Sequence, residues 1–188
     1  METNLKANQV LIPLEKLYRR YTGESLAVKL SDFADVSERI QYLVTQVEEI
    51  TKIDNFGAYL TAMLEIDAFF MNEDRHTNNI AVIYNEKTQK YELSPFFDQG
   101  LCMFADINQD YPIDQSLEYC LEKIEAKPFS SDFDIQLDAA EELYGIQKIQ
   151  TGTALKYFPI ILNYSYFILN KRKRTGTFLQ KVRYKNFR

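Results

Sequence analysis

The most regular hydrophobic pattern in this chain has the period of an amphipathic helix. Between residues 35 and 51 an apolar side chain recurs every three or four positions, which predicts a helix with one buried face. Asp35 and Ser37 are candidates for its N-cap. An earlier helix is predicted from Pro13, which suits the first helical turn, to Gly23, which can end a helix.

Residues 55–72 are apolar on nearly every side, so they are predicted to form the central helix of the core. Two segments rich in β-branched and aromatic residues follow, "IAVIY" and "KYELSPFF", separated by the polar residues "NEKTQ". This order is typical of a β-hairpin with a short loop. A polar stretch, "NEDRHTNN", stands between the predicted core helix and the hairpin.

The remainder of the chain is predicted to be helical. The segments are about 113–125, about 131–144 after a serine cap, about 153–170, which Pro159 should bend or shorten, and 176–186. At 188 residues, without repeats or linker-like segments, the chain is expected to form a single domain, residues 1–188. The predicted fold is therefore mainly α with one small β-hairpin.

Charge is distributed unevenly along the chain. Residues 1–142 contain all 27 acidic residues and 12 of the 22 Lys and Arg, a balance of −15, whereas residues 143–188 contain ten basic residues and no acidic one. We interpret the basic segment, about 153–188, as a helical region that neutralises an acidic body. The alternative is a nucleic-acid-binding arm with interleaved aromatic residues. Direct nucleic-acid binding is not expected, because the acidic body would repel a polyanion.

The chain shows no signal for secretion or membrane insertion. Its N-terminus lacks an apolar signal region, and the apolar run 155–169 is interrupted by Asn163 and Ser165 and is too short to span a bilayer. A cytoplasmic location without a membrane partner is therefore expected. The two cysteines, Cys102 and Cys120, match neither a disulfide framework nor a metal-binding pair, and both are predicted to be reduced and structural.

The polar stretch contains the candidate chemistry. Asp74 and Asn79 precede the predicted hairpin and Asp98 follows it, so the hairpin should return Asp98 to the neighbourhood of the other two. Phosphoryl transfer uses such a set: one carboxylate accepts the proton of the attacking hydroxyl, while a second carboxylate and an amide oxygen hold Mg²⁺. In protein kinases the Asn of the catalytic loop follows the catalytic Asp by five positions, as Asn79 follows Asp74.

The order D-x-H-x-x-N, a hairpin and then Pro-aromatic-aromatic-Asp resembles the C-terminal lobe of HipA-like serine/threonine kinases, a fold that phosphoinositide kinases use in variant form. The resemblance is strongest over residues 55–105, with the catalytic loop and hairpin at about 72–100. It implies that Asp74 is the catalytic base, that His76 is the histidine of the catalytic loop, and that Asn79 and Asp98 bind Mg²⁺ and ATP. It further implies a protein substrate and, in many members, a toxin–antitoxin pair with an antitoxin-type partner.

Several residues in and near the polar stretch also have interpretations that do not involve catalysis. Each of these polar residues taken alone also fits a cap or turn role, and Asn78 is interpreted as a turn residue. Glu73 and Arg75 are expected to face solvent, although Arg75 is also a candidate anchor for phosphate or for a carboxylate of the loop. Gln99 stands where ordinary protein kinases have Phe.

A kinase also needs an N-terminal lobe with a glycine-rich loop and a lysine on a strand. The chain's six glycines lie too far apart to form such a loop. The isolated chain is therefore expected to have little or no kinase activity, and a separate N-lobe protein is a candidate partner. The alternative is a non-catalytic module of the same fold that binds a protein or nucleic acid.

Overall fold

The computed structural model describes residues 5–146, which belong to one compact unit. The helices predicted over 153–170 and 176–186, and with them the basic C-terminal segment, lie outside the described residues. The prediction of a single domain over 1–188 therefore stays a prediction.

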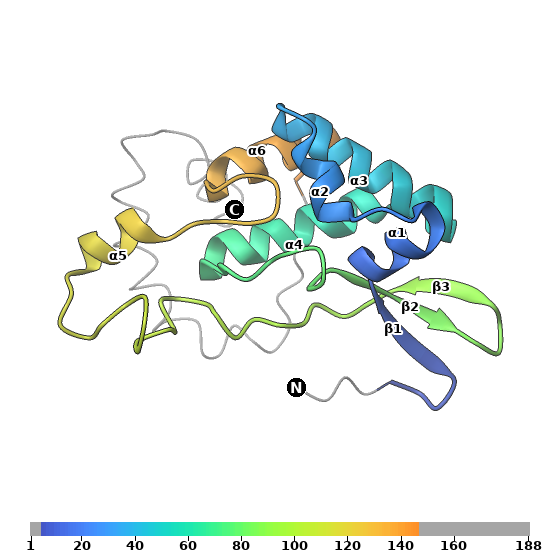
Figure 1. The fold of residues 1–188 in the computed structure, drawn as a ribbon, viewed down its shortest axis with the longest axis horizontal. Coiled ribbons are helices and arrows are strands. Elements are labelled where there is room, and N and C mark those ends of the chain that lie inside the picture. Colours follow the sequence, from blue (N-terminus) through green and yellow to red (C-terminus); the bar gives the residue numbers. More distant parts are fainter. Residues whose placement is uncertain (1–4, 147–188) are drawn as a thin grey trace, which may run out of the picture. The chain divides into compact units, whose positions relative to one another are not determined.

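The described part of the chain is mainly α-helical, with six helices and a small antiparallel sheet of three strands (Figure 1). The helices are α1 (Leu14–Thr22), α2 (Leu26–Ser31), α3 (Val36–Thr51), α4 (Phe56–Phe70), α5 (Leu117–Lys123) and α6 (Phe133–Tyr144), and the strands are β1 (Gln9–Pro13), β2 (Ala81–Asn85) and β3 (Lys90–Leu93). The predicted helical class and the hairpin, now β2 and β3, are confirmed.

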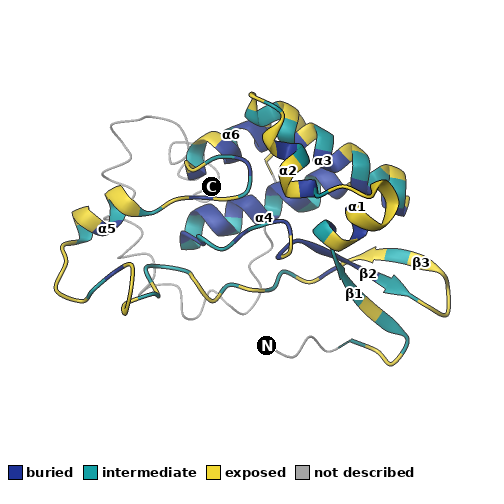
Figure 2. Ribbon diagram, viewed as in Figure 1, coloured by how far each residue is buried: buried dark blue, intermediate teal, exposed yellow. Residues whose placement is uncertain are grey.

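Helix α4 is the centre of the core, as its uniformly apolar sequence predicted. None of its residues is exposed (Figure 2). Leu60, Met63 and Leu64 are fully buried. Helices α3 and α6 pack against it. A helix with no solvent face gains its stability from burial of apolar surface on several sides, so α4 is a rigid support for the loop that follows it.

Most of the helix-end signals that the sequence predicted are present, with one wrong cap. Pro13 precedes α1, Gly23 ends it in the left-handed conformation at φ +82°, and the Asp35 carboxylate caps α3 by accepting from the N–H groups of Ser37 and Glu38. At α6 the predicted serine cap is wrong. The carboxylate of Asp132 accepts from the first free N–H groups of that helix, because a cap must lie immediately before the first helical residue.

The sheet differs from the predicted two-stranded hairpin. Strand β1 pairs with β2, with Leu11 opposite Ile83 and Pro13 opposite Ala81, so the order is β1-β2-β3. The sequence showed β1 only as a short apolar run before a proline, and its partner lies far along the chain. The second strand also ends early, at Leu93, so Asp98 lies in an irregular segment beyond the strand rather than at its end.

Two helices also differ from prediction. Helix α2 was not predicted, and the helix predicted over 113–125 covers only Leu117–Lys123. A helix of only six residues buries too few apolar side chains to show a period. Across residues 5–146, no helix combines the length and apolar character that crossing a membrane requires.

We expect Gly57→Ala to destabilise the protein by about 1–2 kcal/mol, although alanine favours a helix over glycine. A Cβ at Gly57 would overlap Cδ1 of the Tyr144 ring, where α4 meets α6. Urea unfolding of the two proteins measures the difference. In a Tyr144→Ala background the ring is gone, so the same change should become neutral or stabilising. An equal loss in both backgrounds would contradict this explanation.

Candidate active site

The candidate site is built on the loop that leaves the C-terminus of α4. Met71 adopts a left-handed conformation at φ +52° and turns the chain away from the helix axis. Asn72 is fully buried and holds the turn, since its N–H donates to the Asp67 carbonyl and its Nδ2 to Asp67 Oδ1 at 2.8 Å. Asn72 Oδ1 then accepts from the N–H of Asp74 at 3.2 Å. These hydrogen bonds fix the position of Asp74 relative to the core helix α4.

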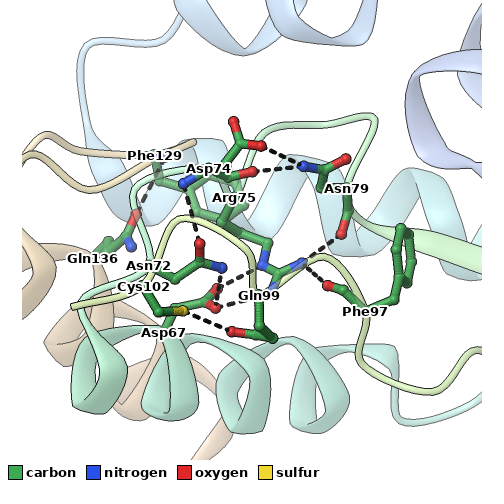
Figure 3. Close-up of polar contacts among 10 residues, drawn as sticks. All are labelled: Asp67, Asn72, Asp74, Arg75, Asn79, Phe97, Gln99, Cys102, Phe129 and Gln136. Atoms are coloured by element: carbon green, nitrogen blue, oxygen red, sulfur yellow. Dashed lines mark hydrogen bonds and ion pairs between the residues drawn. The ribbon is translucent and has the colours of Figure 1, made fainter. Parts of the chain in front are cut away.

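Arg75 is the centre of this arrangement, and the expectation that it faces solvent is wrong. Its side chain has no exposed surface and forms a bidentate pair with Asp67, with Nε 2.7 Å from Oδ2 and Nη2 2.9 Å from Oδ1 (Figure 3). Nη1 donates to the carbonyl oxygens of Asn79 at 2.6 Å and Phe97 at 3.0 Å. A buried guanidinium needs a carboxylate and several acceptors, and the fold supplies them.

Arg75 therefore joins three segments that are separate in the sequence. They are the end of α4 through Asp67, the loop before β2 through Asn79, and the segment after β3 through Phe97 (Figure 3). The last contact brings the backbone next to Asp98 against the 72–79 loop. The predicted return of this segment to the loop is thus confirmed for its backbone.

Asp74 and Asn79 are in direct contact. Asn79 Nδ2 donates to the Asp74 carbonyl oxygen at 2.8 Å and to Asp74 Oδ2 at 3.1 Å (Figure 3). Both partners are acceptors, so the amide nitrogen must face them, and this sets the orientation of the amide group. Asn79 Oδ1 points the other way and remains available as a ligand. The side chain of Asn79 is buried and that of Asp74 is partly exposed.

His76 supports the same loop. Its N–H donates to the Asp74 carbonyl at 3.0 Å, and its Nε2 lies 3.6 Å from Asp74 Oδ1, beyond ordinary hydrogen-bond length. Its ring is 43 % exposed, and its buried Nδ1 has no hydrogen-bond partner within the described residues. Asn78 is exposed in the turn that follows, in keeping with its interpretation as a turn residue.

Asp98 is the least constrained of the predicted site residues. It is exposed and has a left-handed backbone at φ +57°, unusual for a residue other than glycine. Its carboxylate forms no hydrogen bond or ion pair with any residue in the range 5–146. No group of three or more His, Cys, Asp or Glu side chains in that range is arranged to hold a metal. A magnesium site here would therefore depend on Asn79 and Asp98 together with ligand oxygens.

Several residues at the site were not identified from the sequence. Asp67 and Asn72 hold Arg75 and the loop, and the only signal for Asp67 was an acidic residue within an apolar helix. Glu73 is only partly exposed, contrary to expectation, because it accepts a short hydrogen bond from the Tyr111 hydroxyl. That contact ties the loop to the segment before α5.

Cys102 lies beside the buried pair and donates to Gln99 Oε1 at 3.4 Å (Figure 3). Burial raises the pKa of its thiol to about 11, and the Asp67 carboxylate contributes in the same direction. The thiol is therefore neutral and unreactive at pH 7. Cys102 and Cys120 are both free, and Cys120 is buried.

The structure thus brings Asp74, His76 and Asn79 together on one loop and holds the backbone beside Asp98 against it. Arg75, paired with the buried Asp67, provides the hydrogen bonds that join the carbonyl oxygens of Asn79 and Phe97. Comparison of the chain with protein-family models, with curated proteins and with solved structures found no match in any of the three.

Proposed function

We propose that this chain is the catalytic lobe of a HipA-like phosphotransferase, which transfers the γ-phosphoryl group of ATP to a Ser or Thr hydroxyl of a protein. The observation that carries the proposal is the double hydrogen bond from Asn79 to Asp74, on a loop that Arg75 ties to the segment containing Asp98. A base and two oxygen ligands on adjoining segments are what phosphoryl transfer requires of this lobe.

Asp74 is the proposed base. Its carboxylate is partly exposed, so a substrate hydroxyl can approach it, and Asn79 Nδ2 orients it through Oδ2. As the hydroxyl oxygen forms its bond to the γ-phosphorus, its proton passes to the Asp74 carboxylate. The bond from that phosphorus to the bridging oxygen breaks at the same time, leaving ADP. His76, whose N–H donates to the Asp74 carbonyl, is the proposed positioning residue for this loop.

The oxygen ligands fit Mg²⁺. Asn79 Oδ1 is directed away from the amide's hydrogen bonds to Asp74, and the Asp98 carboxylate has no competing partner within residues 5–146. Magnesium ions in such sites are held by one or two carboxylates together with substrate phosphates. When bound, the ion would neutralise charge on the phosphates during transfer.

A non-catalytic binding module of the same fold is the second candidate. It is favoured by one observation, that no two of the chain's glycines are close enough to form a phosphate-binding loop. On this alternative the chain binds a protein, such as a separate N-lobe or an antitoxin-type partner. Nucleotide dependence separates the two candidates, because only the catalytic lobe should need Asp98 for binding ATP with a divalent ion.

The test is binding of Mn²⁺·ATP to the full chain, followed by electron paramagnetic resonance of the ion. We expect wild type to bind and Asp98→Asn to bind about tenfold or more weakly, because one charged ligand is lost. Asp54→Asn is the matched control, since Asp54 is exposed and distant in sequence from the loop. Failure of wild type to bind, both alone and with a candidate N-lobe, or equal binding by all three proteins, would support the non-catalytic module instead.

A further inference from the structure

Two neighbouring hollows adjoin the candidate catalytic loop, with volumes of about 240 and 510 Å³. They share Ala27 and Thr77 in their walls and are therefore adjacent, and the two together are called the groove below. The walls of the first include Arg39, His76 and Lys127. The walls of the second include Glu15, Lys16, Arg19 and Asn78. Three consecutive residues of the loop, 76–78, therefore belong to the groove.

The groove is basic although the body around it is acidic. Residues 5–146 contain 12 Lys and Arg and 26 acidic residues, since Glu2 is the one acidic residue outside this range, a balance of −14. The groove is nevertheless lined by four of those twelve basic residues, Lys16, Arg19, Arg39 and Lys127, and by the chain's only histidine. Its walls contain a single acidic residue, Glu15.

That one carboxylate is already engaged. Glu15 Oε2 accepts from the N–H of Ala27 and the hydroxyl of Thr77, each at 3.0 Å, and Oε1 pairs with Arg19 at 3.1 Å. Burial acts to raise the pKa of Glu15, but hydrogen bonds, including one from Ser25, outweigh it and the pKa is lowered. Glu15 is therefore ionised at neutral pH and neutralises Arg19 rather than the other basic residues.

Three positive charges of the groove lack a carboxylate partner within the described range. Arg39 is held by two backbone carbonyls, Phe33 O at 2.8 Å and Phe129 O at 2.7 Å, which orient its guanidinium without cancelling its charge. Lys16 and Lys127 are exposed and form no ion pair with residues 5–146. A fixed guanidinium and two ammonium groups without a carboxylate partner in the described range attract carboxylates.

We propose that this groove binds an acidic peptide segment of the protein substrate and presents its hydroxyl to Asp74. This inference rests on the proposed function and adds the class of substrate. The groove reaches His76, and His76 Nε2 lies 3.6 Å from Asp74 Oδ1, so an acidic segment in the groove lies next to the proposed base. Residues 143–188 contain no acidic residue, so that part of the chain offers no such occupant.

The charge of the surroundings favours a peptide over nucleic acid. A nucleic acid carries continuous negative charge, which the acidic body outside the groove would repel. A peptide with acidic residues only beside its hydroxyl places charge within the groove alone. Electrostatic complementarity of this local kind selects partners and speeds their association.

The test uses the full chain and two fluorescein-labelled peptides. One peptide has a single serine flanked by Asp and Glu, and the other has Asn and Gln at those flanking positions. In the absence of nucleotide, fluorescence anisotropy should show that only the acidic peptide binds. Lys16→Glu with Lys127→Glu should weaken that binding about tenfold or more, because two attractions become repulsions. The control, Lys87→Glu with Lys90→Glu, has the same net charge but alters exposed residues of the β2–β3 hairpin and should bind like wild type.

Three outcomes would overturn the inference: no preference for the acidic peptide, equal weakening in both double variants, or a single-stranded RNA of equal charge that displaces the peptide. Peptide binding needs neither ATP nor a metal, so its failure would leave the Mn²⁺·ATP result intact. Failure of ATP binding would likewise leave an acidic-peptide site.

Discussion

Arg75→Leu is expected to lower the free energy of unfolding by about 3–5 kcal/mol, because it leaves the Asp67 carboxylate buried without its partner. Both side chains of the pair have no exposed surface, so water cannot replace the lost contacts. The carbonyl oxygens of Asn79 and Phe97 also lose their donor. A loss of this size is a large part of the stability of a typical domain, and urea unfolding followed by circular dichroism measures it.

Two further variants separate the charge from the hydrogen bonds. Asp67→Asn together with Arg75→Leu removes the unpaired charge, so the double variant should be more stable than Arg75→Leu alone. Arg75→Lys keeps the charge but cannot form the bidentate contact, and it should be intermediate. Arg19→Leu is the control, because the Arg19 side chain is 63 % exposed and should matter little. Equal stability of Arg75→Leu and Arg19→Leu would show that the buried pair does not hold the loop.

Asp74→Asn is expected to reduce phosphoryl transfer by about 10²–10⁴-fold, since an amide cannot accept the proton of the attacking hydroxyl. The fold should persist, because the replacement keeps an oxygen that can accept from Asn79 Nδ2. Transfer is measured with γ-labelled ATP and the acidic serine peptide. The assay compares wild type and variant in the same preparation, with the chain alone and with any N-lobe partner that it requires.

A separate readout distinguishes loss of the base from loss of binding. Asp74 is not a proposed metal ligand, so Asp74→Asn should bind Mn²⁺·ATP like wild type, whereas Asp98→Asn should not. Asp74→Glu retains a carboxylate on a longer side chain and should keep part of the activity. Full transfer by Asp74→Asn would exclude Asp74 as the base, even if the metal assignment held.

The elements that could be predicted from the sequence are those determined by neighbouring residues. The period of apolar positions identified α3, and the uniformly apolar segment identified α4 as the core helix. Asp35 caps α3 within its own first turn, and Gly23 ends α1, so both ends were visible locally. The candidate loop was likewise predicted from a spacing of five between Asp74 and Asn79, and these two side chains are in contact.

The features that were missed depend on residues that are distant in the sequence. Strand β1 joins the sheet through pairing with β2, which no local pattern reports. The burial of Arg75 was not foreseen because a charged residue in a polar stretch is usually solvated, and its partner Asp67 lies on the preceding helix. Only the turn at Met71 brings the two together.

By itself the sequence determined the helical class, the core helix, the hairpin and the order of the candidate site residues, since these follow from local periodicity and spacing. Tertiary structure alone decided that Arg75 is buried, that it holds the 72–79 loop against Phe97, and that basic residues from separate segments line one groove in an acidic body. The physical reason is that burial and charge pairing depend on which distant segments the folded chain brings into contact.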